Sequence, residues 1–166
     1  MGEPRVLVIG YGNPARGDDG VGPALAARLE ALGLPGVTVE ADYQLCIEHA
    51  ALAAEHDIVI FADAATDAAG PFYVRPLEGD ASASFCSHAA TPAQVVHLAR
   101  SCFDAAPRSY LLGIRARAIE GFEETLSAEA RAGLDAALAH LVAWLTRQRA
   151  GELPATGERR CETAST

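Results

Sequence analysis

Short apolar runs alternate with helix-forming segments along this chain, and the alternation constrains its fold more than any other feature. We predict strands over 5–10, 37–42, 57–63, 71–76 and 109–115, and helices over 20–33, 44–55, 91–104 and 127–149. A strand that is followed by a helix returns most readily to a parallel strand of the same sheet. The pattern therefore predicts a doubly wound α/β fold with helices on both faces of the sheet.

The predicted architecture is a single-domain three-layer α/β/α sandwich over residues 1–149, with a mostly parallel, twisted five-stranded sheet. The run 57–63 is continuously apolar, as expected for a central strand covered on both faces. Pro71 and Pro76 bound a segment of alternating character, which favours an antiparallel edge strand. Residues 150–166 are polar and without periodicity, so we expect a disordered tail.

The composition excludes several classes of protein. The formal net charge is -9, and all thirteen basic residues are arginine, which disfavours nucleic acid as a partner. No apolar run is long enough to span a membrane or to form a signal peptide, so we expect no membrane partner and a cytoplasmic location. The four cysteines form no C-x-x-C pair, and neither a zinc knuckle nor a disulfide framework is indicated.

The loop 10–20, directly after the first predicted strand, carries two carboxylates rather than a phosphate cradle. Asp18 and Asp19 lie there, Asp63 ends the third strand, and His88 lies in a small-residue loop before a helix. Ligand sites in such folds gather beyond the carboxyl ends of the strands. We therefore expect Asp19, Asp63 and His88 to converge and to bind a divalent ion such as nickel or zinc, with open positions for substrate or water.

Each of these residues also has a simpler explanation. Asp18 fits a helix cap as well as it fits a role in the site. Cys86 lies two residues before His88 and is either a small buried apolar residue or a further metal ligand. The other histidines are expected to be surface or packing residues: His49, His56, His97 and His140.

A dinucleotide-binding domain is the main alternative. Gly10-x-Gly12-x-x-Ala15 matches the looser fingerprint of such domains, and Glu40 or Asp42 could bind ribose hydroxyls. The mechanism requires a helix that begins at the second glycine, whereas here the loop continues into two carboxylates that repel phosphate. Neither a G-x-S-x-G elbow nor an H-E-x-x-H helix is present.

Several segments together resemble the hydrogenase maturation proteases, the endopeptidases that trim the large subunit of nickel-iron hydrogenases. The opening motif is Val8-Ile-Gly-Tyr-Gly-Asn-Pro-Ala-Arg-Gly-Asp-Asp-Gly-Val-Gly22. Further matching segments are Tyr43-Gln-Leu45 with Glu48, Phe61-Ala-Asp63-Ala, Ser87-His88 with Thr91-Pro92, and Gly121-Phe-Glu-Glu-Thr-Leu-Ser127. Their order and spacing follow the family over residues 5–147.

The resemblance implies a function and a set of site residues. The three metal ligands of the family fall on Asp19, Asp63 and His88, which act in catalysis through the metal. Members recognise nickel already inserted in the large-subunit precursor and then remove its C-terminal extension, so nickel comes with the substrate; other divalent cations could replace it. The alternative is a nickel- or dinucleotide-binding α/β module without catalysis.

Overall fold

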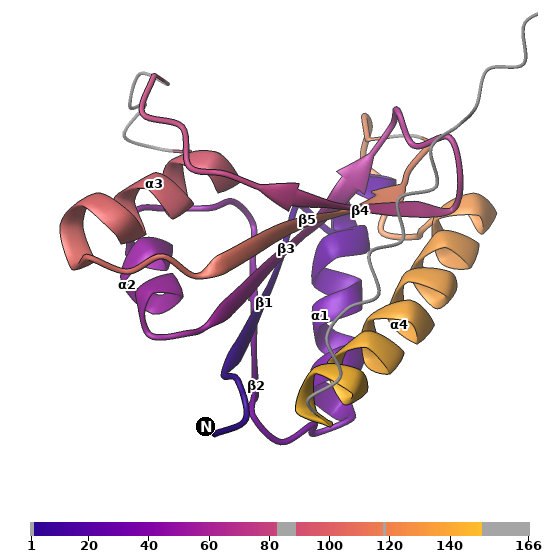
Figure 1. Cartoon of the computed structure of the whole chain (residues 1–166). Helices are drawn as coiled ribbons and strands as arrows, with labels where there is room; N and C mark the ends of the chain where they lie inside the picture. Colours follow the sequence, from indigo (N-terminus) through magenta and orange to yellow (C-terminus); the bar gives the residue numbers. More distant parts are fainter. Residues whose placement is uncertain (1, 83–88, 118, 151–166) are drawn as a thin grey trace, which may run out of the picture.

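One mixed sheet of five strands organises the molecule (Figure 1). The computed structural model describes residues 2–82, 89–117 and 119–150. Across the sheet the order is β2 (Val37–Asp42), β1 (Val6–Tyr11), β3 (Ile58–Ala65), β5 (Arg108–Arg115) and β4 (Phe72–Leu77). All neighbouring strands are parallel except β4, which pairs antiparallel with β5 at the edge. The predicted central strand and the predicted antiparallel edge strand are both confirmed.

Two pairs of helices cover the two faces of the sheet (Figure 1). The helices α1 (Val21–Ala31) and α4 (Ala128–Arg149) lie on one face, and α2 (Glu48–Ala54) and α3 (Pro92–Phe103) lie on the other. A short 3-10 helix, η1 (Gly17–Gly20), precedes α1. The predicted three-layer α/β/α architecture is therefore confirmed.

Successive side chains of a strand pack alternately into two separate hydrophobic cores, one on each face of the sheet. Val6 and Val8 of β1 pack toward α1 and α4, while Leu7 and Ile9 pack toward α2 and α3. Each of these four side chains is at most 2% exposed. Burial on both faces explains why the inner strands β1 and β3 appear as continuous apolar runs in the sequence.

Two helix starts follow from the local sequence. Thr91 caps α3 with a complete capping box, in which its hydroxyl accepts from the Gln94 amide and the Gln94 side chain accepts from the Thr91 amide. Ser127 caps α4 by accepting from the Ala130 amide. Both helices begin within one residue of the predicted starts at 91 and 127.

The second helix is shorter than predicted. It begins at Glu48 rather than at Gln44, because Leu45 is drawn into the core and its carbonyl accepts from the Ala90 amide at 2.9 Å. The Leu45 carbonyl thus accepts a hydrogen bond from a distant segment and not from a helical turn. Among the described residues, no helix is both long and apolar enough to cross a membrane.

Candidate functional site

The carboxyl ends of β1, β2 and β3 meet at one edge of the sheet, and the predicted acidic residues gather there. Tyr11 at the end of β1 is in register with Asp42 at the end of β2. Asp63 follows Ala62, the partner of Gly10, near the end of β3. Parallel pairing thus brings residues far apart in the chain to one rim, as expected for this class of fold.

The glycine-rich turn holds Asp19 against the end of β1. Gly12 has a φ of 141°, a conformation that favours glycine, and a Cβ at this position would collide with the Asp19 carbonyl. The Asn13 amide donates to the Asp19 carboxylate at 3.0 Å. The turn therefore fixes Asp19 by both its backbone and its side chain.

Asp63 is a partly buried carboxylate within the electrostatic field of Asp19. Burial and, to a smaller extent, the Asp19 charge raise the pKa of Asp63. Hydrogen bonds from the Tyr11 hydroxyl and from the Ala64 amide, the latter at 2.7 Å, act in the opposite direction. Asp19 and Asp63 are therefore near enough at this edge for their charges to interact.

Tyr11 is hydrogen-bonded to Asp63 at this edge. Its pKa is raised, first by burial and then by Asp63, with a smaller effect of Asp19. The phenol thus stays neutral and donates a hydrogen bond to Asp63. Sequence reasoning missed this residue, although a tyrosine between the two glycines of the turn is visible in the sequence.

Asp18 has a structural role that the sequence did not reveal. It is only 1% exposed, and its carboxylate accepts from the Arg117 amide, the Ser127 amide and the Ser127 hydroxyl, each at 2.7 Å. Neither η1 nor α1 has a side-chain cap. The interpretation of Asp18 as a cap of its own helix is therefore wrong: it braces the cap residue of α4 instead.

His88 and Cys86 lie outside the described residues, so neither the third predicted ligand nor the predicted thiol is placed. The described chain resumes at Ala89, and the Ala90 amide donates to Leu45 beyond the end of β2. Ala90 is two residues after His88 in the sequence. The chain thus enters α3 from the edge that carries Asp19 and Asp63.

A second polar cluster at this edge was not predicted. Cys46 Sγ lies 3.1 Å from His49 Nδ1, which also accepts from the Cys46 amide at 3.0 Å. His49 Nε2 lies 3.8 Å from Asp42 Oδ2. The signal in the sequence was a cysteine three residues before a histidine at the start of a helix, a spacing that places both side chains on one turn.

The Cys46 thiol is not set up as a nucleophile. Burial and a hydrogen bond with Glu48 raise its pKa, which favours the thiol over the reactive thiolate. His49 is 7% exposed, which agrees with the expectation of a packing residue. That expectation did not include its contacts with Cys46 and Asp42.

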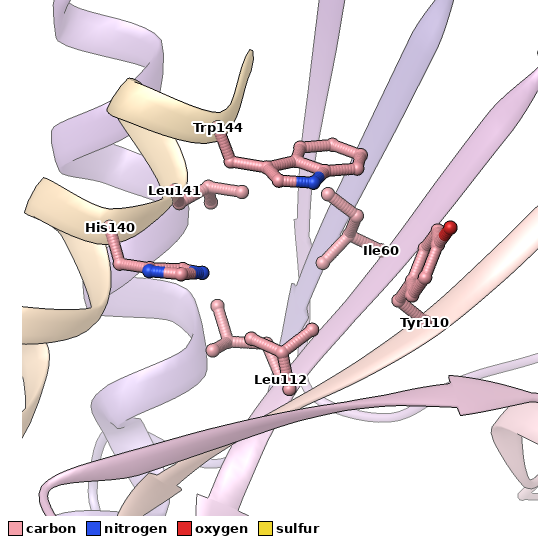
Figure 2. Close-up of a pocket in the computed structure, with 7 residues that line it drawn as sticks. Ile60, Tyr110, Leu112, His140, Leu141 and Trp144 are labelled. Atoms are coloured by element: carbon pink, nitrogen blue, oxygen red, sulfur yellow. The ribbon is translucent and has the colours of Figure 1, made fainter. Parts of the chain in front are cut away.

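A small apolar pocket lies elsewhere, between α4 and the sheet. Figure 2 shows side chains from α4 facing strand residues across a small apolar space. Its volume is about 30 Å³, room for only a few water molecules. It is lined by Ile60, Val74, Tyr110, Leu112, His140, Leu141 and Trp144. These contacts identify a packing gap beneath α4, and its lining includes none of the rim carboxylates.

The dinucleotide alternative loses its main support. Its fingerprint requires a helix that begins at the second glycine, but α1 begins only at Val21, after the turn and η1. The carboxylates of Asp18 and Asp19 occupy the intervening segment.

Comparison with solved structures shows what this fold is similar to. No protein-family model and no curated protein matches the sequence. The [NiFe] hydrogenase maturation protease HycI from Thermococcus kodakarensis KOD1 has 22% identity and a TM-score of 0.67, over 89% of this chain and 95% of that chain. The hydrogenase maturating endopeptidase HybD from E. coli has 23% identity and a TM-score of 0.65, over 86% and 93%.

A third structure agrees with these two. The hydrogenase 2 maturation peptidase from Thaumarchaeota archaeon SCGC_AB-539-E09 has 24% identity and a TM-score of 0.64, over 86% of this chain and 98% of that chain. Each comparison spans nearly the whole of the solved chain. The resemblance found in the sequence is thereby confirmed at the level of the fold: this chain has the fold of the hydrogenase maturation proteases.

Proposed function

We propose that this protein is an endopeptidase that removes the C-terminal extension from a nickel-loaded [NiFe]-hydrogenase large-subunit precursor. The observation that carries the proposal is the pair Asp19 and Asp63, coupled at the rim of a fold that maturation proteases share. The opening motif supplies the first of these carboxylates and β3 supplies the second. The activity belongs to the named relatives and is proposed here for this chain.

The donor set fits a divalent transition ion. Two carboxylates near each other are stabilised by a shared cation, which balances their negative charge. Tyr11 holds Asp63 by a hydrogen bond, and the Asn13 amide holds Asp19. With His88 as the third ligand, the set is of mixed oxygen and nitrogen type, which suits nickel or zinc.

In this proposal the nickel arrives with the substrate. Three ligands from the protease leave positions that the precursor's own metal site fills, so a precursor without nickel docks poorly. Cleavage then depends on successful metal loading, because the interaction that favours the reaction is made only by the loaded substrate. The protease would therefore act as a checkpoint late in maturation.

A cleavage assay on two forms of the precursor tests the proposal. Purified protein is mixed with nickel-loaded and with nickel-free precursor, and loss of the extension is followed as a shift in gel mobility. We expect a shortened product from the loaded precursor only. The variants Asp19→Asn, Asp63→Asn and His88→Gln should lower the cleavage rate at least about a hundredfold. Glu55→Gln should not, because Glu55 is exposed between the end of α2 and the start of β3, at the opposite edge of the sheet.

Two results would overturn the proposal. A stable complex with loaded precursor that yields no product would show a binding module without catalysis. Micromolar binding of a dinucleotide would restore the alternative that the fingerprint at Gly10 suggested. A lowered cleavage rate counts only for variants whose circular dichroism spectrum shows an intact fold.

A further inference from the structure

The β2–α2 junction carries a second set of donor atoms that the proposed protease reaction does not use. Cys46, His49 and Asp42 each offer one donor atom, and these atoms all lie within 4.8 Å of one another. The contacts are 3.1 Å between Cys46 Sγ and His49 Nδ1, and 3.8 Å between His49 Nε2 and Asp42 Oδ2. Sulfur, nitrogen and oxygen donors thus meet at one point of the sheet edge.

The three donor atoms are close enough to approach a single ion. Tetrahedral zinc holds sulfur at about 2.3 Å and nitrogen or oxygen at about 2.0–2.2 Å, so neighbouring donors are about 3.3–3.6 Å apart. One donor atom from each residue lies within 4.8 Å of the other two, so each pair has to approach by at most about 1.5 Å to reach this spacing. The 3.1 Å and 3.8 Å contacts involve different ring nitrogens of His49, of which only one binds the ion.

The local charge also favours a cation. Asp42 and Glu48 are both exposed carboxylates at this junction, and Glu48 is hydrogen-bonded to the Cys46 side chain. Within the part of the chain that the structure describes, no arginine forms an ion pair with either of them. The junction therefore gathers negative charge around a thiol and an imidazole without a protein countercharge.

Helix capping explains only part of this arrangement. The bond from the Cys46 amide to His49 Nδ1 secures the first turn of α2, which has no other side-chain cap. It does not account for the sulfur beside the same nitrogen or for the carboxylate beside the other one.

We propose that Asp42, Cys46 and His49 form a binding site for a borderline-soft divalent cation of the zinc class. Each residue supplies one donor to the ion: Cys46 its sulfur, His49 one ring nitrogen and Asp42 a carboxylate oxygen. The site is distinct from the pair Asp19 and Asp63, and it does not depend on the proposed protease activity. The two lie side by side, since the Gly12 amide donates to the Asp42 carbonyl at 3.0 Å.

Cobalt is a suitable probe, because a thiolate bound to Co²⁺ gives a charge-transfer absorption that carboxylate and imidazole ligands do not. The full-length protein is titrated with Co²⁺ under reducing conditions, and the bound Co²⁺ is then displaced with Zn²⁺. We expect one thiolate-bound Co²⁺ per chain, removed by Zn²⁺. Absence of the charge-transfer band would overturn the proposal.

A pair of matched variants assigns the sulfur. The variant Cys86→Ser/Cys102→Ser/Cys161→Ser keeps Cys46 as its only cysteine and should retain the band in full. Cys46→Ser should lose it. A band that survives in Cys46→Ser, or that vanishes in the variant with Cys46 alone, places the thiolate elsewhere and contradicts the assignment.

Two further variants test the other donors. His49→Gln and the surface change Asp42→Asn should each weaken Co²⁺ binding at least about tenfold, with an unchanged circular dichroism spectrum. Because the Asp42 side chain is 45% exposed, Asp42→Asn should not disturb the fold, and weaker binding in this variant reports the loss of a ligand. The double variant Asp19→Asn/Asp63→Asn should leave the band intact, and its loss there would show a single shared site.

Discussion

At the scale of single residues, Asp18 accepts three hydrogen bonds from distant parts of the chain, and a substitution can test their contribution to stability. Asp18→Asn leaves one carbonyl oxygen where a carboxylate accepted from the Arg117 amide and from two groups of Ser127. The new amide group also turns its own N–H toward those donors. We expect a loss of about 2 kcal/mol or more in the free energy of unfolding, measured by urea denaturation. The exposed control Asp67→Asn should change it by no more than about 0.5 kcal/mol.

The adjacent residues Asp18 and Asp19 lie in different surroundings. Their adjacency in the sequence suggested that one is structural and one functional, and the structure separates them: Asp18 points to the α4 cap, while Asp19 lies at the rim with Asp63. The sequence could rank Asp19 above Asp18 as a ligand. It could not name the partners of Asp18, because they are 99 and 109 residues away.

At the scale of elements, the start of α1 packs directly on the ends of two strands. A Cβ at Gly22 would meet the carbonyl oxygens of Tyr11 and Ala62. Gly22→Ala should therefore push α1 from the sheet, and we expect a loss of about 1–3 kcal/mol by urea denaturation. Gly70→Ala, where a Cβ meets only an ordinary contact, is the control. Equal midpoints for Gly22→Ala and the wild type would contradict the close packing.

The contact of α4 with the sheet has its own pH dependence. Burial, with a smaller effect of Arg147, lowers the pKa of His140, which packs against Phe72 with ring centroids 5.2 Å apart. The unfolded chain therefore binds the proton more readily than the folded one, so this residue destabilises the fold as the pH falls below the ordinary histidine range. From about pH 7 to about pH 5, His140→Gln should lose less stability in thermal unfolding than the wild type. Parallel curves would contradict this account.

At the scale of the whole molecule, both cores lie within the described part of the chain before residue 150. Their buried members run from Val6 to Leu145. The division into a domain over 1–149 and a disordered tail stays a prediction. Deletion of residues 151–166 should leave one cooperative unfolding transition in urea, followed by circular dichroism. The free energy of unfolding should stay within about 0.5 kcal/mol of that of the full chain. A shift well beyond this would show that the tail packs on the domain.

The sequence by itself determined the type and order of the elements. Continuous apolar runs identified the buried parallel strands, two prolines identified the edge strand, and the helices predicted over 91–104 and 127–149 correspond to α3 and α4. These signals are local, because periodicity, caps and proline act over a few neighbouring residues. The same local logic brought Asp19 and Asp63 to one edge, since parallel strands end at the same rim.

Only the tertiary structure decided which side chains touch. The hydrogen bond of Tyr11 with Asp63, the brace between Asp18 and Ser127, and the cluster of Cys46 with His49 and Asp42 join segments through strand register and loop contacts. Register depends on how both faces of the sheet are packed at once, which no local pattern specifies. The chain's own pattern thus determined its layers, whereas the packing of those layers determined the chemistry of the rim.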